Sequence, residues 1–275
     1  MSIYRLMIGI VLGPAVAYAA WRRQMLTQDG ALAAALLGAL VFGLGGLPWA
    51  VLLLAFFLSS SALSKSFSRH KTGLAEKFSK GGQRDWMQVA ANGGSAALLV
   101  VLQTILPGQT WPWLAFAAAM AAVNADTWAT ELGVLSPTAP RLITGGKIVE
   151  KGTSGGITLT GTLASLAGAA LIGGLAAIFP DLAGLRTVKQ GVFLSAAVTL
   201  AGLLGSLLDS WLGATLQAIY YCHACGKETE RHPQHSCGTL THRIRGLAWL
   251  NNDMVNLLAS LAAAVLMVAV WQGWR

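Results

Sequence analysis

The chain has 275 residues, of which 55% are hydrophobic and 11% charged, whereas a soluble globular protein carries about 25% charged residues. This shortage of charge excludes an ordinary soluble enzyme, and the long apolar segments that recur from end to end exclude a disordered or collagen-like chain. A net charge of +8 would favour a nucleic-acid partner in a soluble protein, but in a chain of the lipid bilayer Lys and Arg first mark the cytoplasmic loops, so we expect a membrane protein with no nucleic-acid partner.

Apolar segments of about 20 residues are long enough to cross a hydrocarbon core. Such segments lie at residues 2–20, 87–106, 112–134, 157–179, 190–220 and 247–272. The segment 31–63 is too long for one helix, and the glycines before Pro48 favour a break. It predicts two short spans, 31–45 and 48–63, or a bent hairpin. The predicted fold is an all-α, polytopic membrane helix bundle of about eight spans, with residues 1–275 forming a single transmembrane domain.

The distribution of basic residues favours eight spans. With both termini outside, the cytoplasmic loops around residues 22–23, 65–84, 141–151 and 227–245 hold fifteen of the nineteen Lys and Arg residues. Fusing 31–63 into one span would move the most basic loop to the wrong side. The first segment also resembles a secretory signal peptide, because Arg5 precedes an apolar run that ends in Ala17 and Ala19.

Ionisable residues within spans are costly and are candidates for function. Four carboxylates fall in the cytoplasmic halves of three spans: Asp126, Glu131, Asp209 and Asp253. For any one of them a hydrogen bond that helps helices to pack is the plain alternative. Together they suit a hard cation such as Mg²⁺, which binds carboxylate oxygens and keeps substrate phosphates as further ligands. Asn92 on the fourth span is a further polar residue that we expect near these carboxylates.

A segment rich in Gly and hydroxyl groups, residues 147–156, opens the sixth span. Exposed backbone N–H groups, a positive helix end and nearby lysines would suit phosphate, and glycine lets an anion approach the backbone. The candidate ligands here are Lys147, Lys151, Thr153, Ser154 and Gly155. Close helix packing is the alternative reason for the glycines. The basic loop 64–86 adds Lys65, Lys71 and Arg84, for which a topology signal or attraction to anionic lipid is the alternative.

Three cysteines and four histidines gather in the cytoplasmic loop 221–246. Cys222 and Cys225 form a Cys-x2-Cys pair, and His235 and Cys237 follow. Four such ligands suit a closed, structural zinc site that fixes the loop near the mouth of a cavity. His232 is an alternative to His235, and a disulfide is an alternative to zinc.

Six blocks of sequence resemble the family of integral membrane proteins known as domain of unknown function 92, which includes the plastid phytyl-phosphate kinase. The blocks are residues 88–94, 124–133, 140–147, 152–158, 205–217 and 249–256. They occur in order over most of the chain from about residue 60 to residue 260. The resemblance implies a kinase that transfers a phosphoryl group from a nucleoside triphosphate to a prenyl (phytyl-like) monophosphate.

Under that resemblance the residues acquire roles. Asp126, Asp209 and Asp253 would hold Mg²⁺ or orient the acceptor, with Glu131 as a further candidate, and the segment 147–155 would hold the nucleotide phosphates. Lys65, Lys71, Arg84 and Arg141 would flank those phosphates, and the prenyl tail would lie between spans. Two alternatives remain at this point: a nucleotidyltransferase that forms a CDP-lipid with the same groups, and a lipid or ion transporter with a polar cavity on the cytoplasmic side.

Overall fold

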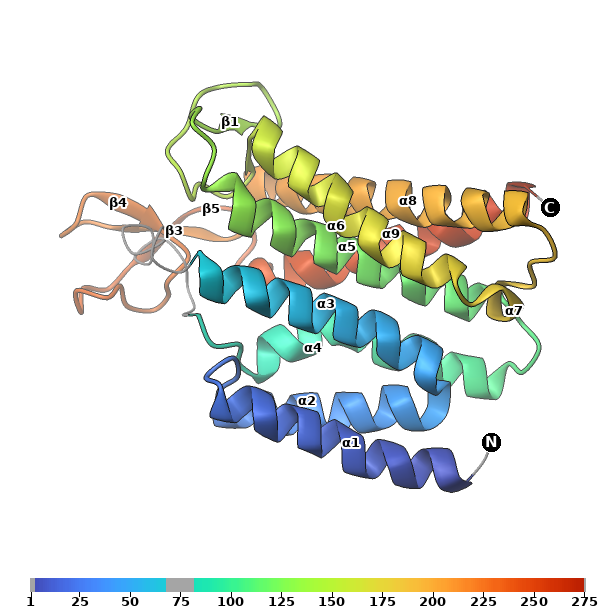
Figure 1. Cartoon of the computed structure of the whole chain (residues 1–275). Coiled ribbons are helices and arrows are strands. Elements are labelled where there is room, and N and C mark those ends of the chain that lie inside the picture. The colour runs from blue at the N-terminus through green and yellow to red at the C-terminus, as the bar shows by residue number, and fades with distance from the viewer. Residues whose placement is uncertain (1–2, 68–81, 275) are drawn as a thin grey trace.

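The computed structural model describes residues 3–67 and 82–274. In these ranges eight long helical segments run along one common axis (Figure 1). They are α1 (Ile3–Arg22), α2 (Gln28–Leu40) with its π-helical continuation η1 (Val41–Gly45), α3 (Leu47–Ser66), α4 (Trp86–Ile105), α5 (Trp111–Gly133), α6 (Leu159–Ala177), α8 (Val188–Thr215) and α9 (Asn252–Trp274). A short helix, α7 (Pro180–Ala183), joins α6 to α8.

Seven of the described helical segments are long and apolar enough to cross a membrane. The remaining long helix, α5, is 23 residues long but carries Asn124, Asp126 and Glu131, which lower its hydropathy. Helices α1 and α9 reach the chain ends at the same end of the bundle (Figure 1), as an even number of crossings requires. The prediction of a polytopic helical bundle is therefore confirmed.

Helix α5 forms the centre of the core. All of its side chains from Pro112 to Ala125 are buried, and the core cluster surrounds them with residues of α3, α4, α6, α8 and α9. Small residues allow this close packing: a Cβ atom on Gly202 or Gly205 of α8 would lie 2.6 Å from a methyl group of α5. The carboxylates of α5 are thus held on a helix that its neighbours fix from several sides.

The segment 31–63 is broken where the sequence predicts it. Helix η1 ends at Gly45, and the next residue, Gly46, has a φ of +76°, which residues with a Cβ rarely adopt. Pro48 lies in the first turn of α3. The two helices on either side, α2 with η1 and α3, both run along the bundle (Figure 1). The segment therefore forms two spans.

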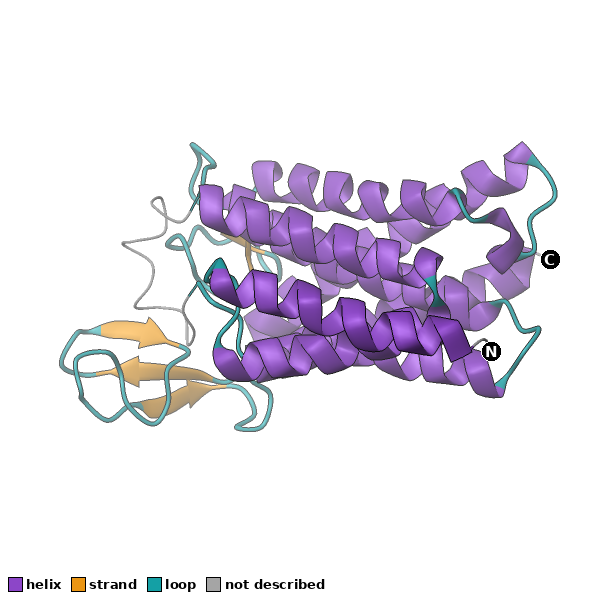
Figure 2. Ribbon diagram, turned by 60° about the horizontal axis from the view of Figure 1, so that its bottom comes forward, coloured by secondary structure: helices purple, strands orange, loops and turns teal. Residues whose placement is uncertain are grey.

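Short strands and loops cover one end of the bundle (Figure 2). Strand β1 (Arg141–Leu142) pairs antiparallel with β2 (Gly156–Ile157). Strand β3 (Ile219–Cys222) lies between β4 (Lys227–Thr229) and β5 (His242–Arg245) in a three-stranded antiparallel sheet.

This small sheet corrects two predicted boundaries. The seventh span was expected to reach residue 220, but α8 ends at Thr215 and the apolar residues that follow form β3. The last span was expected from residue 247, but α9 begins at Asn252. A short apolar run has a similar hydropathy in a membrane span and in a buried strand, so hydropathy alone could not distinguish the two.

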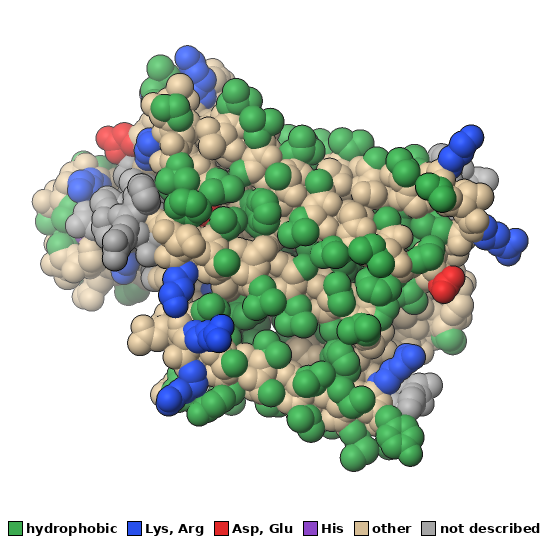
Figure 3. All heavy atoms as spheres, in the orientation of Figure 1, with side chains coloured by type: hydrophobic (Ala, Val, Ile, Leu, Met, Phe, Trp, Pro, Cys, Tyr) green, Lys and Arg blue, Asp and Glu red, His purple; other side chains and the backbone are tan. Residues whose placement is uncertain are grey.

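The surface of the molecule is also divided into an apolar middle and charged ends. On the face shown in Figure 3, Lys and Arg side chains gather at the two ends of the bundle, and the middle shows hydrophobic and uncharged groups. Large apolar side chains are exposed along the helices, among them Leu36, Leu98 and Val265. Such a band is what a bilayer covers.

Candidate functional site

A polar cavity of about 500 Å³ opens at the end of the bundle that carries the strands. Its walls come from the C-terminal halves of α5 and α8, the N-terminal turns of α4, α6 and α9, and the Gly-rich segment before α6. Nine of the residues predicted from the sequence line it: Arg84, Asn92, Asp126, Glu131, Lys151, Thr153, Ser154, Gly155 and Asp209. Segments that are far apart in the sequence therefore meet at one chamber.

Three carboxylates form an acidic cluster in this cavity. Asp126 of α5, Asp209 of α8 and Glu230 of the loop after β4 lie close enough for their charges to interact. Asp209 is 9% exposed, and its Oδ2 atom is buried with no hydrogen-bond partner among the described residues. A buried carboxylate oxygen without a donor, beside two more carboxylates, fits a cation ligand, and oxygen-only ligands suit Mg²⁺.

Glu230 is a site residue that the sequence analysis missed. Its Oε1 accepts hydrogen bonds from the Ser154 hydroxyl at 3.0 Å and the Gln217 amide at 2.7 Å. It lies between the Cys222–Cys225 pair and His235, so the prediction that this loop is fixed near the cavity mouth was the signal that could have found it. The loop contributes a carboxylate as well as a support.

Glu131 and Arg84 form a further part of the cavity wall. Glu131 is buried and accepts a hydrogen bond of 2.7 Å from the Ser64 hydroxyl of α3. Arg84 precedes α4, and burial lowers the pKa of its guanidinium to about 10 although the charge of Glu131 opposes this shift. The guanidinium stays charged at neutral pH, so the wall presents one cation to any anion that enters.

The Gly-rich segment reaches the cavity, but from a turn and a strand rather than from a helix. Helix α6 begins at Leu159, and the Thr158 hydroxyl caps it by accepting the Gly161 N–H at 3.0 Å. The helix thus begins two residues after the predicted start of the span at residue 157, because Thr158 is a strong N-cap, and residues 147–156 lead into it. Gly155 has a φ of +80° and packs against Ala214 of α8, which holds the segment to the bundle.

Lys151 is anchored beside the cavity. Its ammonium donates hydrogen bonds to the Val134 and Ser136 carbonyls at 3.0 and 2.8 Å. These carbonyls follow the C-terminus of α5, where a cation is favoured. Its charge therefore lies at the cavity wall, while two of its three donors support the loop.

The remaining predicted residues do not join the described cavity wall. Arg141 turns back to the Gly146 carbonyl at 2.9 Å, and Lys65 and Lys147 are exposed. Asp253 is buried in the first turn of α9, where Asn252 and Asn256 line the cavity instead. Its place follows from the rotation of α9 about its axis, which packing sets. Lys71 lies outside the described residues.

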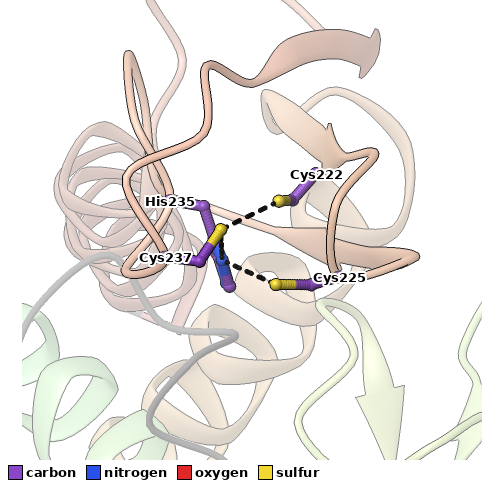
Figure 4. Close-up of side chains that lie close together, drawn as sticks. All are labelled: Cys222, Cys225, His235 and Cys237. Carbon is purple, nitrogen blue, oxygen red and sulfur yellow. Dashed lines mark hydrogen bonds between the residues drawn. The ribbon is translucent and has the colours of Figure 1, made fainter.

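The Cys/His loop forms a compact cluster. The ligand atoms of Cys222, Cys225, His235 and Cys237 all lie within 4.8 Å of one another (Figure 4). Two sulfurs, of Cys222 and Cys237, are 3.5 Å apart, and His235 Nδ1 lies 3.5 and 3.4 Å from the sulfurs of Cys225 and Cys237. A zinc tetrahedron with bonds of about 2.3 Å to sulfur has edges of roughly 3.5–3.8 Å, so the cluster can hold a metal such as zinc.

The choice between the two histidines is resolved by their contacts. His235 is buried among the sulfurs, whereas His232 stacks on the Tyr220 ring at 4.4 Å between centroids. None of the three cysteines forms a disulfide in the described structure. Hydrogen bonds from Thr239 and His235 lower the pKa of Cys237 to about 5, so this ligand is a thiolate at neutral pH.

Comparison with known proteins identifies the family. The model of the family "Integral membrane protein DUF92" matches residues 11–264, which is most of the chain. The chain belongs to the DUF92 family. All of the cavity-lining residues and the Cys/His cluster lie within the matched part. The resemblance found in the sequence blocks is thus confirmed.

Several curated relatives of this DUF92 chain span nearly its whole length. Protein PGR of Arabidopsis thaliana is 35% identical over 96% of this chain and 95% of its own. An uncharacterized membrane protein of Methanocaldococcus jannaschii is 29% identical over 98% of this chain and 96% of its own. Protein VTE6, chloroplastic, of Arabidopsis thaliana is 29% identical over 90% of this chain and 67% of its own. No solved structure matches the chain significantly.

Proposed function

We propose that this DUF92 protein is a membrane kinase that transfers a phosphoryl group from a nucleoside triphosphate to a prenyl (phytyl-like) monophosphate. One observation carries the proposal: the carboxylates of α5, α8 and the Cys/His loop face a cavity whose other walls are the Gly-rich segment and Arg84. Acidic metal ligands opposite groups that bind phosphate are what phosphoryl transfer requires of a protein. Similarity to VTE6 and membership of the family support the same reaction.

The residues divide the work between donor and acceptor. Thr153, Ser154 and the backbone at Gly155 would hold the phosphates of the nucleotide, with the charge of Lys151 behind them. Asp126, Asp209 and Glu230 would hold Mg²⁺, which neutralises charge on the transferred phosphoryl group. Asn92 and Arg84 would bind the acceptor phosphate. Asp253 lies less than one helical turn from Asn256 and would support the metal ligands from outside the cavity wall.

The reaction needs no strong general base. An oxygen of the acceptor monophosphate attacks the γ-phosphorus of the nucleotide, and the bond between that phosphorus and the β,γ-bridging oxygen breaks. The products are a prenyl diphosphate and a nucleoside diphosphate, with no net uptake of a proton when the acceptor is a dianion. The cavity accordingly needs to position the two anions in line and to balance their charge.

The direct test is turnover by purified protein in detergent with Mg²⁺, a panel of nucleoside triphosphates and prenyl monophosphates of several lengths. We expect prenyl diphosphate from the wild type and a loss of at least about 100-fold in kcat in Asp126→Asn, because electrostatic groups at a reacting centre carry that much of the rate. Asp181→Asn is the matched control, since Asp181 is exposed on α7 at the other end of the bundle. No turnover by the wild type with any donor would refute the kinase.

The same assay separates the other enzyme that these groups would suit. A nucleotidyltransferase would join the lipid phosphate to the α-phosphate of CTP and release inorganic diphosphate, whereas the kinase releases a nucleoside diphosphate. A transporter would need its polar groups to be reachable from both faces. The cavity described above opens at one end of the bundle, which favours an enzyme.

A further inference from the structure

A second cavity, of about 320 Å³, lies among α1, α2, η1, α3 and α4. Its walls are almost entirely apolar and include Leu12, Val16, Leu37, Phe42, Leu53 and Phe57. It extends along α3 from Phe57 to Ala50, a depth of about 10 Å at 1.5 Å per residue. A chamber of this kind suits a hydrocarbon chain.

This apolar chamber adjoins the polar cavity. Arg84, Gln88 and Asn92 line both, so the two spaces meet at the N-terminal turns of α4. A ligand that filled both would place a charged end beside the acidic cluster and an apolar end among α1–α4. The pair of chambers therefore matches an amphipathic molecule with one phosphate and one tail.

The backbone of Arg84 is fixed at this junction. Its N–H donates to the Met25 carbonyl at 3.0 Å, and its carbonyl accepts the N–H and the hydroxyl of Thr27 at 3.1 and 3.2 Å. The turn between α1 and α2 thus positions Arg84. Because that turn also joins two helices of the apolar chamber, the position of Arg84 is coupled to the chamber walls.

The side chain of Arg84 lies against two aromatic rings and carries a buried donor. The guanidinium lies over the rings of Phe56 and Phe57, with 5.2 and 5.8 Å to their centroids. Its Nη1 atom is buried with no hydrogen-bond partner in the described part of the chain. A buried donor without an acceptor is rare, and a guanidinium fork fits two phosphate oxygens.

An unusual element lines the end of the chamber that is far from Arg84. Phe42, which lines it, lies in η1, a five-residue π-helix, and such insertions often occur at functional sites. Ala50, which also lines the chamber, lies in the first turn of α3, just after Gly46. Both residues line this end of the chamber, so they are placed to meet the end of a bound chain.

We propose that the chamber among α1–α4 holds the tail of the acceptor lipid, that Arg84 binds its phosphate where the chambers meet, and that Phe42 and Ala50 set the length of tail accepted. The ligand class is a single-chain prenyl phosphate monoester. This inference rests on the proposed function for its reaction but not for its binding site. The bilayer supplies another phosphate monoester, phosphatidic acid, which carries two chains.

Binding is tested without turnover. A prenyl monophosphate with a photoreactive diazirine at the tail end is irradiated with the purified wild type, and the labelled peptides are mapped. We expect labels on residues of η1 and α3 that line the chamber, abolished by excess prenyl monophosphate and retained with prenyl alcohol. Labels confined to outward residues such as Leu58 would overturn the inference, as would equal competition by phosphatidic acid.

Chain-length preference is the second test. Ala50→Phe would fill the end of the chamber and shift the preferred substrate to shorter tails, whereas Phe42→Ala would extend it to longer ones. Ala62→Phe is the control, because Ala62 is exposed on the same helix. Two active variants with an unchanged length profile would refute the end-wall role.

Arg84→Lys tests the phosphate contact. It keeps the charge but loses the fork, and we expect KM for the prenyl phosphate to rise about ten-fold or more while KM for the nucleotide changes by less than about two-fold. An unchanged KM for the lipid would contradict the role of Arg84. If the wild type turns over no prenyl phosphate, the proposed kinase activity is refuted. The labelling experiment still shows whether the chamber binds the lipid tail.

Discussion

At the scale of single residues, local spacing predicted the metal cluster well and the cavity less completely. Cys222, Cys225, His235 and Cys237 are close in sequence, so short loops bring them together and the residue types fix the chemistry. Arg141 and Asp253 show the limit of this reasoning. Their residue types suited phosphate and Mg²⁺, but a side chain can point several ways, and neither is part of the described cavity wall.

The two histidines of the loop allow a matched pair of variants. His235→Asn removes a ligand atom, so we expect the bound zinc to fall well below the level of about one per chain in the wild type. His232→Asn removes a ring that stacks on Tyr220 and should keep its zinc. Metal content of the purified proteins is the measurement. Loss of zinc from His232→Asn alone would reverse the assignment.

At the scale of elements, the Gly-rich segment and the Cys/His loop act together. Ser154 from the one and Glu230 from the other are hydrogen bonded at 3.0 Å, so the loop that can hold zinc also places a carboxylate in the cavity. Gln217, just after α8, fixes the same oxygen. The two residues are 76 positions apart in the chain. They meet because the start of α6 and the end of α8 lie at the same end of the bundle.

Gly155 tests whether the segment must lie against α8. A Cβ there would be 2.4 Å from the Ala214 methyl group, and the φ of +80° disfavours any other residue. We expect Gly155→Ala to reduce unfolding stability by about 1–3 kcal/mol and to reduce turnover as the segment moves. Gly145→Ala is the control, because no atom lies within 4 Å of its Cβ position and its φ lies outside the left-handed region. Thermal unfolding in detergent measures the first effect; equal behaviour of the two variants would count against this role.

At the scale of the whole molecule, charge and topology give an orientation. The end of the bundle with the strands and the polar cavity also carries most of the Lys and Arg residues that the structure describes, and cytoplasmic loops collect such residues. We propose that the cavity faces the cytoplasm and that both termini lie outside. The nucleotide would then be taken from the cytoplasmic pool.

Reporter fusions at the C-terminus check this orientation in a bacterial host. An alkaline phosphatase fusion should be active, because that enzyme requires an oxidising compartment for its disulfides, and a fluorescent-protein fusion should be dark. A fusion in the turn between α1 and α2, near Arg23, is the control and should give the opposite pair of results. The reverse pattern would place the cavity outside and exclude cytoplasmic nucleotide as the donor.

The sequence by itself determined the membrane class, the helical fold, the break before Pro48, the three cysteines of the cluster with a choice between two histidines, and the resemblance to the family. These follow from features within about 25 residues, namely hydropathy, punctuation by Gly and Pro, and ligand spacing. The tertiary structure decided that the run at 219–222 is a strand, that Glu230 joins Asp126 and Asp209, that Asp253 does not line the described cavity, and that Arg84 separates a polar chamber from an apolar one. Each of these depends on how a helix is rotated and which distant segment it meets, and burial of α5 among its neighbours sets those rotations.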